Sequence, residues 1–408
     1  MRDSGVSREL SQVRGFEAKL ALLTRAARLL PSITAPNAAV ERARLIAALE
    51  AGQLPVPCFE YPRGNESAAG VRFVDRLREE AQALPVPQLY LEKLDELELD
   101  LALLAVIGDS RRVRPLSARR FGTGHERVVT PLGELTLAQY ARTLVATQAT
   151  SDEPRVFPPE SHDGSPSLAS VIRALSLRAG LDVQVCVEPN LAAGAATGDR
   201  TVYIAARLFG AREVVRLAVH EVLGHLTAAA NGRAQPLRLI DWGTAGSFAD
   251  QEGVALCLED SFGLLDAGRL RSIGGRVLAT ELMHAGASFG ECATTLLREH
   301  GFSVAESVAL SERAYRGGGV ARDVSYLLGF LRVQAALQSG SATLDELRMG
   351  RVSVAALPQL RQLITLGLAR PAVYRPNFAR SCRSTSSGTM PWRSPPSAAA
   401  SLMSVELT

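Results

Sequence analysis

The sequence is almost devoid of lysine. Of its 408 residues only Lys19 and Lys93 are lysines, although Lys and Arg together number 45. Neither lysine follows a glycine-rich stretch, which excludes the phosphate-binding loop of a Walker-type nucleotide site. The 42 acidic residues leave a net charge of only +3, and so small an excess argues against a dedicated nucleic-acid partner.

Cysteines are too few and too widely spaced to organise the fold. The five of them form no C-x-x-C pair, so the sequence predicts neither a disulfide framework nor a cysteine zinc knuckle. This favours a reducing compartment. Because Met1 leads into polar sequence and not into an apolar signal peptide, we expect a cytoplasmic protein.

Long apolar runs are also missing. Stretches such as Leu101 to Ile107 are far shorter than the ~20 residues of a bilayer span, so we expect no membrane association. Hydrophobic residues nevertheless make up 47% of the chain and charged residues 21%, proportions typical of a globular protein with a substantial core. At roughly 150 residues per domain, the length predicts two or three domains.

Helical periodicity dominates, and the sequence predicts a predominantly helical α+β fold. Residues 1–50 form an N-terminal helical segment. Residues 51–165 mix helical and loop sequence, with 108–165 rich in turn-forming residues and a linker near 154–166. Short strands are expected at 183–187 and 200–205.

From residue 211 to about 368 the pattern is helical again. Glycine-containing breaks are expected in this region at 231–232, 243–246, 274–275, 286–290 and 317–319. The last segment, 379–408, is rich in Ser, Pro and Arg without periodicity, and we expect it to be disordered.

One short stretch offers metal-binding chemistry. Residues 220–225 read HEVLGH and contain two of only six histidines. Apolar residues around them recur at helical spacing, and Asn231-Gly232 predicts the end of that helix. On a regular helix a spacing of five leaves His220 and His225 roughly 140° apart, too far for one ion. We therefore expect a π-turn or local unwinding between Glu221 and His225, with Gly224 permitting it.

Glu252 is a candidate third ligand, 252 − 225 = 27 residues after the second histidine. Two histidines and a glutamate form the ligand set of a catalytic zinc site that keeps a fourth position open for water. The alternatives are that both histidines are ordinary members of an apolar helix, and that Glu252 is an acidic residue favoured by the dipole of a helix N-terminus.

These segments and a later one resemble a known family. They read HEVLGH at 220–225, NGRAQPL at 231–237, QEGVA at 251–255 and YRGGGVARDVSYL at 315–327. In combination they are similar to the bacterial proteins named for a QEGLA motif, which are related to the tyrosine carboxypeptidases that act on microtubules. The resemblance spans about four-fifths of the chain, from residue 50 to residue 378. By this resemblance, the tail beyond Phe378 has no counterpart in the family.

Two departures from the family pattern are present. QEGVA replaces QEGLA but retains the glutamate, whereas Arg322 stands where the family commonly has lysine and puts substrate contacts there in doubt. The resemblance implies a zincin-like metallopeptidase domain over residues 166–378, with residues 51–165 as the N-terminal part of the family region.

Residue roles follow from the resemblance. It implies that His220, His225 and Glu252 bind Zn²⁺, while Glu221 takes the proton from a zinc-activated water. Glu259 is a candidate to orient a histidine, or else it lies on a solvated helix face. We interpret the other histidines as structural, and these are His125, His162, His284 and His300.

Arg316 and Tyr326 are candidates for binding the substrate. Arginine suits a terminal carboxylate because its planar guanidinium donates two parallel hydrogen bonds. The alternatives are a helix C-terminal charge for Arg316 and a core tyrosine with a bonded hydroxyl for Tyr326.

The resemblance implies a carboxypeptidase that acts on peptide or protein C-terminal tails. The alternative is a catalytically silent regulatory or peptide-binding protein on the same fold, since bacterial members carry a label that refers to modulation of flavohaemoglobin expression. A protein that only binds peptides is expected to lose Glu221 or a ligand, and this chain retains all four residues. Aminopeptidase and endopeptidase action remain open at this point, as does the oligomeric state.

Overall fold

The computed structural model describes residues 2–62, 68–147, 156–161, 164–189, 191 and 193–376. The expected disordered tail at 379–408, His162 and part of the expected linker lie outside these ranges. The chain divides into two compact units. Unit 1 comprises Met1–Leu10, Ala149–Asp266 and Gly329–Thr408, and unit 2 comprises Ser11–Gln148 and Ala267–Leu328.

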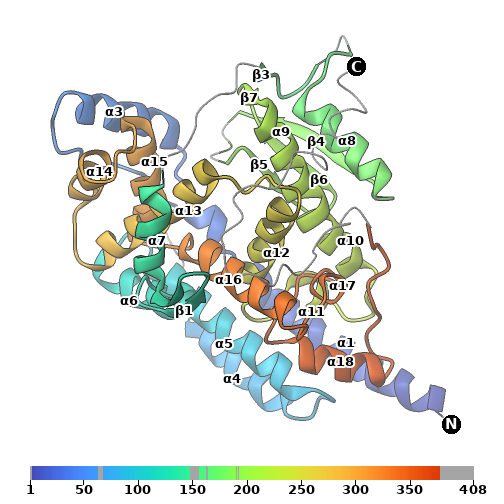
Figure 1. The fold of residues 1–408 in the computed structure, drawn as a ribbon. Coiled ribbons are helices and arrows are strands. Elements are labelled where there is room, and N and C mark those ends of the chain that lie inside the picture. Colours follow the sequence, from blue (N-terminus) through green and yellow to red (C-terminus); the bar gives the residue numbers. More distant parts are fainter. Residues whose placement is uncertain are drawn as a thin grey trace. The chain divides into compact units, whose positions relative to one another are not determined.

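Unit 2 is mainly helical, with one hairpin of β1 (Arg127–Thr130) and β2 (Gly133–Thr136). Its helices, coloured from blue to teal and then ochre in Figure 1, are α1 (Arg2–Ala26, which begins in unit 1), α2 (Leu29–Ser32), α3 (Ala38–Glu50), α4 (Ala68–Ala81), α5 (Pro87–Leu104), α6 (Ser110–Phe121), α7 (Leu137–Ala146), α13 (Ala267–His284), α14 (Phe289–Arg298), α15 (Val304–Tyr315) and the 3₁₀ turn η2 (Arg316–Gly318).

Two helices of unit 2, α6 and α7, lie where the sequence predicts loops. The side chain of Asp109 accepts hydrogen bonds from the first backbone amides of α6. At the start of α7, Thr136 and Gln139 form a reciprocal capping box. Such caps satisfy the free amides of a helix start, so the polar residues that suggested loops mark helix beginnings instead.

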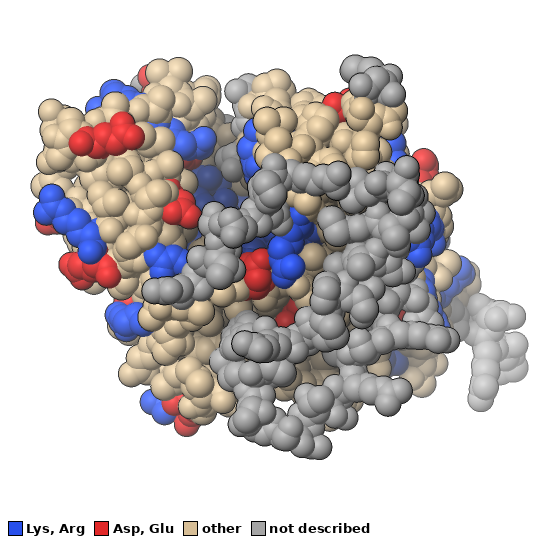
Figure 2. Space-filling view, turned by 45° about the horizontal axis from the view of Figure 1, so that its top comes forward, with Lys and Arg blue, Asp and Glu red and all other residues tan. Residues whose placement is uncertain are grey.

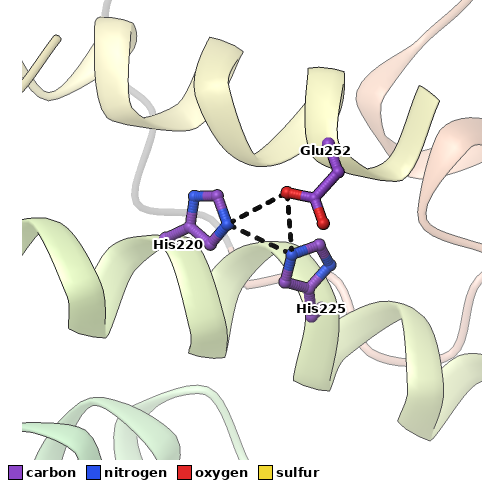
Figure 3. A group of neighbouring side chains, drawn as sticks. All are labelled: His220, His225 and Glu252. Carbon is purple, nitrogen blue, oxygen red and sulfur yellow. Dashed lines mark hydrogen bonds and ion pairs between the residues drawn. The ribbon is translucent and has the colours of Figure 1, made fainter. Parts of the chain in front are cut away.

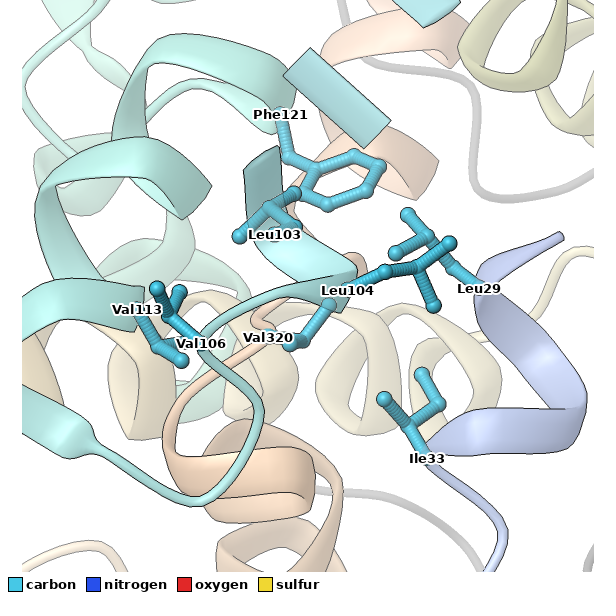
Figure 4. Close-up of a cluster of buried hydrophobic side chains, with 8 residues drawn as sticks. All are labelled: Leu29, Ile33, Leu103, Leu104, Val106, Val113, Phe121 and Val320. Atoms are coloured by element: carbon cyan, nitrogen blue, oxygen red, sulfur yellow. The ribbon is translucent and has the colours of Figure 1, made fainter. Parts of the chain in front are cut away.

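The core of unit 2 includes the apolar cluster drawn in Figure 4, to which α2, α5 and α6 contribute, with Val320 after η2. A second feature of its packing is the crossing of α13 and α7 at Gly274. A Cβ atom there would come within 2.9 Å of the carbonyl oxygen of Ala141. The expected break at 274–275 is therefore wrong, because Gly274 permits close helix packing inside α13.

Unit 1 contains the remaining strands, which are β3 (Val156–Phe157), β4 (Gln184–Glu188), β5 (Ala195–Thr197), β6 (Thr201–Ala205) and β7 (Phe209–Gly210). β4, β6 and β5 form a sheet in that order, with β4 parallel and β5 antiparallel to β6, and Val202 is opposite both Val185 and Thr197. β3 pairs with β7 in a second small sheet. The strands predicted at 183–187 and 200–205 are confirmed to within one residue.

The helices of unit 1 hold the candidate site. They are α8 (Leu168–Arg178), α9 (Ala211–Ala218), the π-helix η1 (Val219–Leu226), α10 (Thr227–Arg233), α11 (Leu239–Trp242), α12 (Ser247–Ser261), α16 (Val324–Gln338, which begins in unit 2), α17 (Leu344–Leu347) and α18 (Leu357–Thr365). α9, η1 and α10 follow one another without a break in one helical segment (Figure 1).

The predominantly helical α+β class predicted from the sequence is confirmed by this architecture. The two units interleave along the chain, since residues 267–328 fall in unit 2, whereas the sequence suggested one contiguous region from 166 to 378. No helix within the described ranges combines the length and hydrophobicity that a membrane span needs. On the face in Figure 2, acidic and basic side chains of the described residues lie interspersed.

Candidate metal centre

The histidine pair lies on the π-helix η1, as the five-residue spacing predicts. The backbone N–H of Thr227 bonds to the carbonyl of Val222, five residues back, and also to Gly224. A regular α-helix would direct that N–H to Leu223. The wider turn absorbs the additional residue and places His220 and His225 on one face of the helix (Figure 3).

Three side chains converge in front of this face. His220 and His225 point toward each other with their Nε2 atoms 3.2 Å apart. Glu252 on α12 points toward both, and its Oε2 lies 3.4 Å from Nε2 of His220 and 3.7 Å from Nε2 of His225 (Figure 3). One ligand atom from each residue lies within 4.8 Å of the other two. The structure thus brings together the three predicted ligands.

The QEGVA segment positions Glu252 through its neighbours. Gln251 donates hydrogen bonds from Nε2 to the carbonyls of Leu347, at 3.0 Å, and Val352, at 2.9 Å. A Cβ atom at Gly253 would collide with the backbone of Gly329 in α16. The glycine therefore permits the two helices to touch, and both contacts fix the direction in which Glu252 projects from α12.

Gly224 has a different role from the one expected. A Cβ atom at this position would lie 3.0 Å from the Cβ of Ala255, and its φ is not positive. The absent side chain therefore brings η1 close to α12, and the π-turn does not depend on glycine's access to left-handed backbone. This close approach lets Glu252 reach both histidines.

The donor set fits a divalent cation. Glu252 is buried, and its Oε2 receives no hydrogen bond of normal geometry although both imidazoles lie near it. An unsatisfied buried carboxylate oxygen is costly without a cation or a donor. Two imidazole nitrogens and one carboxylate oxygen match the ligand types that zinc prefers.

The pKa shifts of His220 and Glu252 also indicate a site that favours a cation. Burial lowers the pKa of His220, but the adjacent carboxylates of Glu252 and Glu259 outweigh this effect and raise the pKa to about 9. Burial raises the pKa of Glu252, yet the neighbouring His225 and His220 hold it well below its usual value. The site therefore favours positive charge between the carboxylates.

Glu259, about two turns after Glu252 on α12, binds the other ring nitrogen of His220. Its Oε1 lies 2.7 Å from Nδ1, and its side chain is fully buried, with Arg216 at 3.8 Å. A carboxylate that accepts the second N–H of a ligating histidine fixes the ring and its tautomer. The alternative of a solvated helix face for Glu259 is wrong, because the residue is inaccessible.

Glu221 projects from η1 toward the sheet. The hydroxyl of Thr197, the last residue of β5, donates a 2.7 Å hydrogen bond to Glu221 Oε2. Thr197 was not anticipated, because the contact joins residues 24 apart and nothing in the local pattern of β5 indicates it. Through this bond, β5 sets the orientation of the carboxylate next to the first histidine.

Two polar residues, Asn231 in α10 and Gln235 just after it, bind the backbone of later segments of the chain. Asn231 donates to the carbonyls of Arg348 and Tyr374, and Gln235 donates to those of Met349 and Arg370. The helix end predicted at Asn231-Gly232 is confirmed to within one residue, since α10 ends at Arg233. The Asn231 amide binds a distant segment and does not cap the helix.

Arg316 and Tyr326 lie in unit 2, and their contact with a substrate stays a prediction. Arg316 occupies η2 directly after α15. The guanidinium of Arg276 lies over the Tyr326 ring, 4.7 Å from its centroid. Nearby, Arg313 donates from Nε and Nη2 to the two carboxylate oxygens of Asp323. Although burial opposes ionisation, this pairing lowers the pKa of Asp323 to about 2.

Comparison with known proteins identifies a family more clearly than a fold. Among solved structures, the chain is similar to a putative lipoprotein from Colwellia psychrerythraea, at 18% identity and a TM-score of 0.46. The match covers 70% of this chain and 65% of that one, so the chain spans about two thirds of that protein's length. None of the curated proteins matches the chain.

A family model described as microtubule-associated tyrosine carboxypeptidase matches residues 50–390. The match begins where the sequence resemblance begins and includes the whole metal cluster. It continues past Phe378, so the expectation that the family region ends there is wrong by about a dozen residues. By this match over most of its length, the chain belongs to the microtubule-associated tyrosine carboxypeptidase family.

Proposed function

We propose that this protein is a zinc-dependent metallopeptidase of zincin-like architecture that removes the C-terminal residue from peptide or protein tails. The observation that carries the proposal is the convergence of His220, His225 and Glu252 on one point through a π-turn. The adjacent Glu221 and the family membership support a peptidase over a storage or structural metal site.

A zinc ion held by these three residues would lower the pKa of a water molecule toward ~7 and polarise the substrate carbonyl. Glu221 then accepts the proton of the attacking water and delivers it to the departing amine. Because Thr197 holds Oε2 of Glu221, we assign the proton to Oε1. Glu259 keeps Nδ1 of His220 engaged, so that Nε2 remains directed at the cluster.

Release of a C-terminal residue also requires recognition of the free α-carboxylate. Both lysines of the chain lie within its first hundred residues, and arginine is the better bidentate partner of a carboxylate. We assign this contact to Arg316, with Tyr326 as a second substrate-binding residue. Arg322 stands one residue before Asp323 and is the alternative cation.

The test combines metal analysis with a release assay on purified full-length protein. We expect about one zinc per chain, and release of C-terminal residues from peptides with a free carboxylate but not from their amidated counterparts. Arg316→Ala should raise the KM for free peptides by the equivalent of ~2–4 kcal/mol and leave any activity on amidated peptides unchanged.

Other outcomes decide against parts of the proposal. Equal cleavage of free and amidated peptides would point to an endopeptidase or aminopeptidase. Tight peptide binding without any cleavage by the zinc-loaded protein would favour a regulatory protein. Full zinc content in His220→Ala or His225→Ala would remove the ligand assignment.

A further inference from the structure

The π-turn that joins the two histidines leaves backbone carbonyls to be satisfied in other ways. In a regular helix the carbonyl of Leu223 would accept the N–H of Thr227, which here bonds to Val222 instead. Two side chains donate to carbonyls of the π-turn, one to Val222, which also accepts the Thr227 N–H, and one to Leu223, which does not. The hydroxyl of Thr227 donates to Val222 at 2.9 Å, and Nη1 of Arg348 donates to Leu223 at 3.2 Å.

Arg348 reaches η1 from a segment, residues 347–354, that is bound on both sides of the metal cluster. From α10, Asn231 donates to the carbonyl of Arg348 at 2.8 Å. From α12, Gln251 donates to the carbonyls of Leu347 and Val352. The 347–354 segment thus connects the helix that follows the histidines with the helix that provides Glu252.

The buried Arg348 side chain makes two polar contacts, one of them with the carbonyl of Leu223. It is only 3% exposed, and its Nε has no hydrogen-bond partner. Besides Leu223, Nη2 meets Oδ1 of Asp345 at 3.4 Å. A guanidinium in such a place is costly to bury. Asp345 offsets part of this cost at one nitrogen, and the carbonyl of Leu223 accepts from another.

We propose that Arg348 is a positioning residue of the metal centre, which holds η1 in its π conformation by occupying the carbonyl of Leu223. Without it, the N–H of Thr227 can return to Leu223, and the helix regains regular α geometry. Each residue of an α-helix turns by about 100°, so His225 would then rotate away from His220 and Glu252. The inference rests on the proposed zinc site and adds the residue that shapes it.

The experiment measures zinc affinity by competition with a chromophoric chelator, and ligand geometry by the visible spectrum of the cobalt-substituted protein. Arg348→Met should weaken zinc binding about tenfold or more and alter the cobalt spectrum. Arg348→Lys, which retains a donor, should recover part of the affinity.

Arg351→Met is the matched control. Arg351 lies in the same segment, but its side chain donates to the carbonyl of Asp241 at 2.6 Å and to the carboxylate of Asp199 at 3.1 Å. Its replacement should leave zinc affinity and the cobalt spectrum as in the wild type. Equal losses in both variants would overturn the proposal, because the segment would then act as a whole.

A second pair of variants keeps the inference testable if Arg348→Met does not fold. Thr227→Val removes the other side-chain donor to the π-turn without changing volume, whereas Thr227→Ser retains it. We expect weaker zinc binding in the first only. Wild-type affinity in a folded Arg348→Met or in Thr227→Val would overturn the inference, and a wild-type protein with no zinc affinity would overturn the proposed function itself.

Discussion

Buried charges occur in both units, but they are arranged in opposite ways. In unit 2, Lys93, Glu96, Asp100 and Arg120 of α5 and α6 form a closed network. Each acid meets a base, with Lys93 and Glu96 at 2.7 Å and Arg120 and Asp100 at 2.7 Å. In unit 1, Oε2 of Glu252 faces two histidines without a normal hydrogen bond.

From this difference we infer that the buried charges of unit 2 stabilise the fold, whereas those of unit 1 bind a ligand. The network of unit 2 satisfies itself, because burial raises the pKa of Asp100 while Arg120 counters that effect. The cluster of unit 1 instead directs two imidazole nitrogens and a carboxylate oxygen at a common point, as a cation site requires. Replacements in the first network should therefore change folding stability, and replacements in the second should change zinc binding or turnover.

The largest effect is expected for Glu221→Gln. The amide retains the size of the side chain but cannot accept the proton, so turnover should fall 10²–10⁴-fold while zinc content stays at about one per chain. Steady-state kinetics and metal analysis of the same preparation provide the measurement. Glu213→Gln on the neighbouring helix α9 is the control, and unchanged turnover in Glu221→Gln would mean that another residue is the base.

Arg120→Met should break the paired network. It leaves the buried carboxylate of Asp100 without its partner, which costs about 3–5 kcal/mol of unfolding free energy. Urea unfolding measures this loss. The double variant Arg120→Met, Asp100→Leu should recover much of the stability, because both buried charges are then removed. Loss of zinc affinity in a folded Arg120→Met would contradict the expectation that the charges of unit 2 serve stability and those of unit 1 serve zinc binding.

Glu259→Gln tests the metal cluster of unit 1 through the carboxylate that binds Nδ1 of His220. Glutamine can still accept the Nδ1 proton of His220, but it lacks the negative charge that strengthens the histidine as a ligand. Zinc affinity should fall about 10–100-fold. Competition with a chelator measures it, and Glu291→Gln, an exposed capping glutamate in unit 2, serves as control. Equal affinity in both variants would show that Glu259 acts in packing alone.

The helical class, both strands of the parallel pair and the π-turn could be predicted from the sequence because each depends on local spacing. The five-residue interval between His220 and His225 predicts a departure from regular helix if both histidines bind one ion. Glycine was harder to interpret. Gly224 and Gly274 suggested backbone freedom, whereas each brings two helices into contact, and the sequence does not say which neighbour approaches.

Residues that act across long intervals could not be predicted. Arg348 reaches Leu223 across 125 residues, and Asn231 reaches the backbone of Tyr374 across 143. Their side chains look like any exposed arginine or asparagine until the fold brings the segments together. The division into two interleaved units escaped prediction for the same reason, because it depends on which helices pack together.

Thr197→Val is expected to have the smallest effect. Within unit 1, it distinguishes a residue that orients Glu221 from the residues that bind zinc. Valine keeps the shape of the side chain but cannot donate to Glu221, so the carboxylate loses the bond that orients it. A hydrogen bond to a charged group contributes about 1.5–3 kcal/mol, and since water can replace part of it at this half-buried site, we expect kcat to fall about tenfold. Zinc content and KM should stay unchanged, and Thr197→Ser should behave as wild type. A rise in KM at constant kcat would instead assign Thr197 to substrate binding along β5.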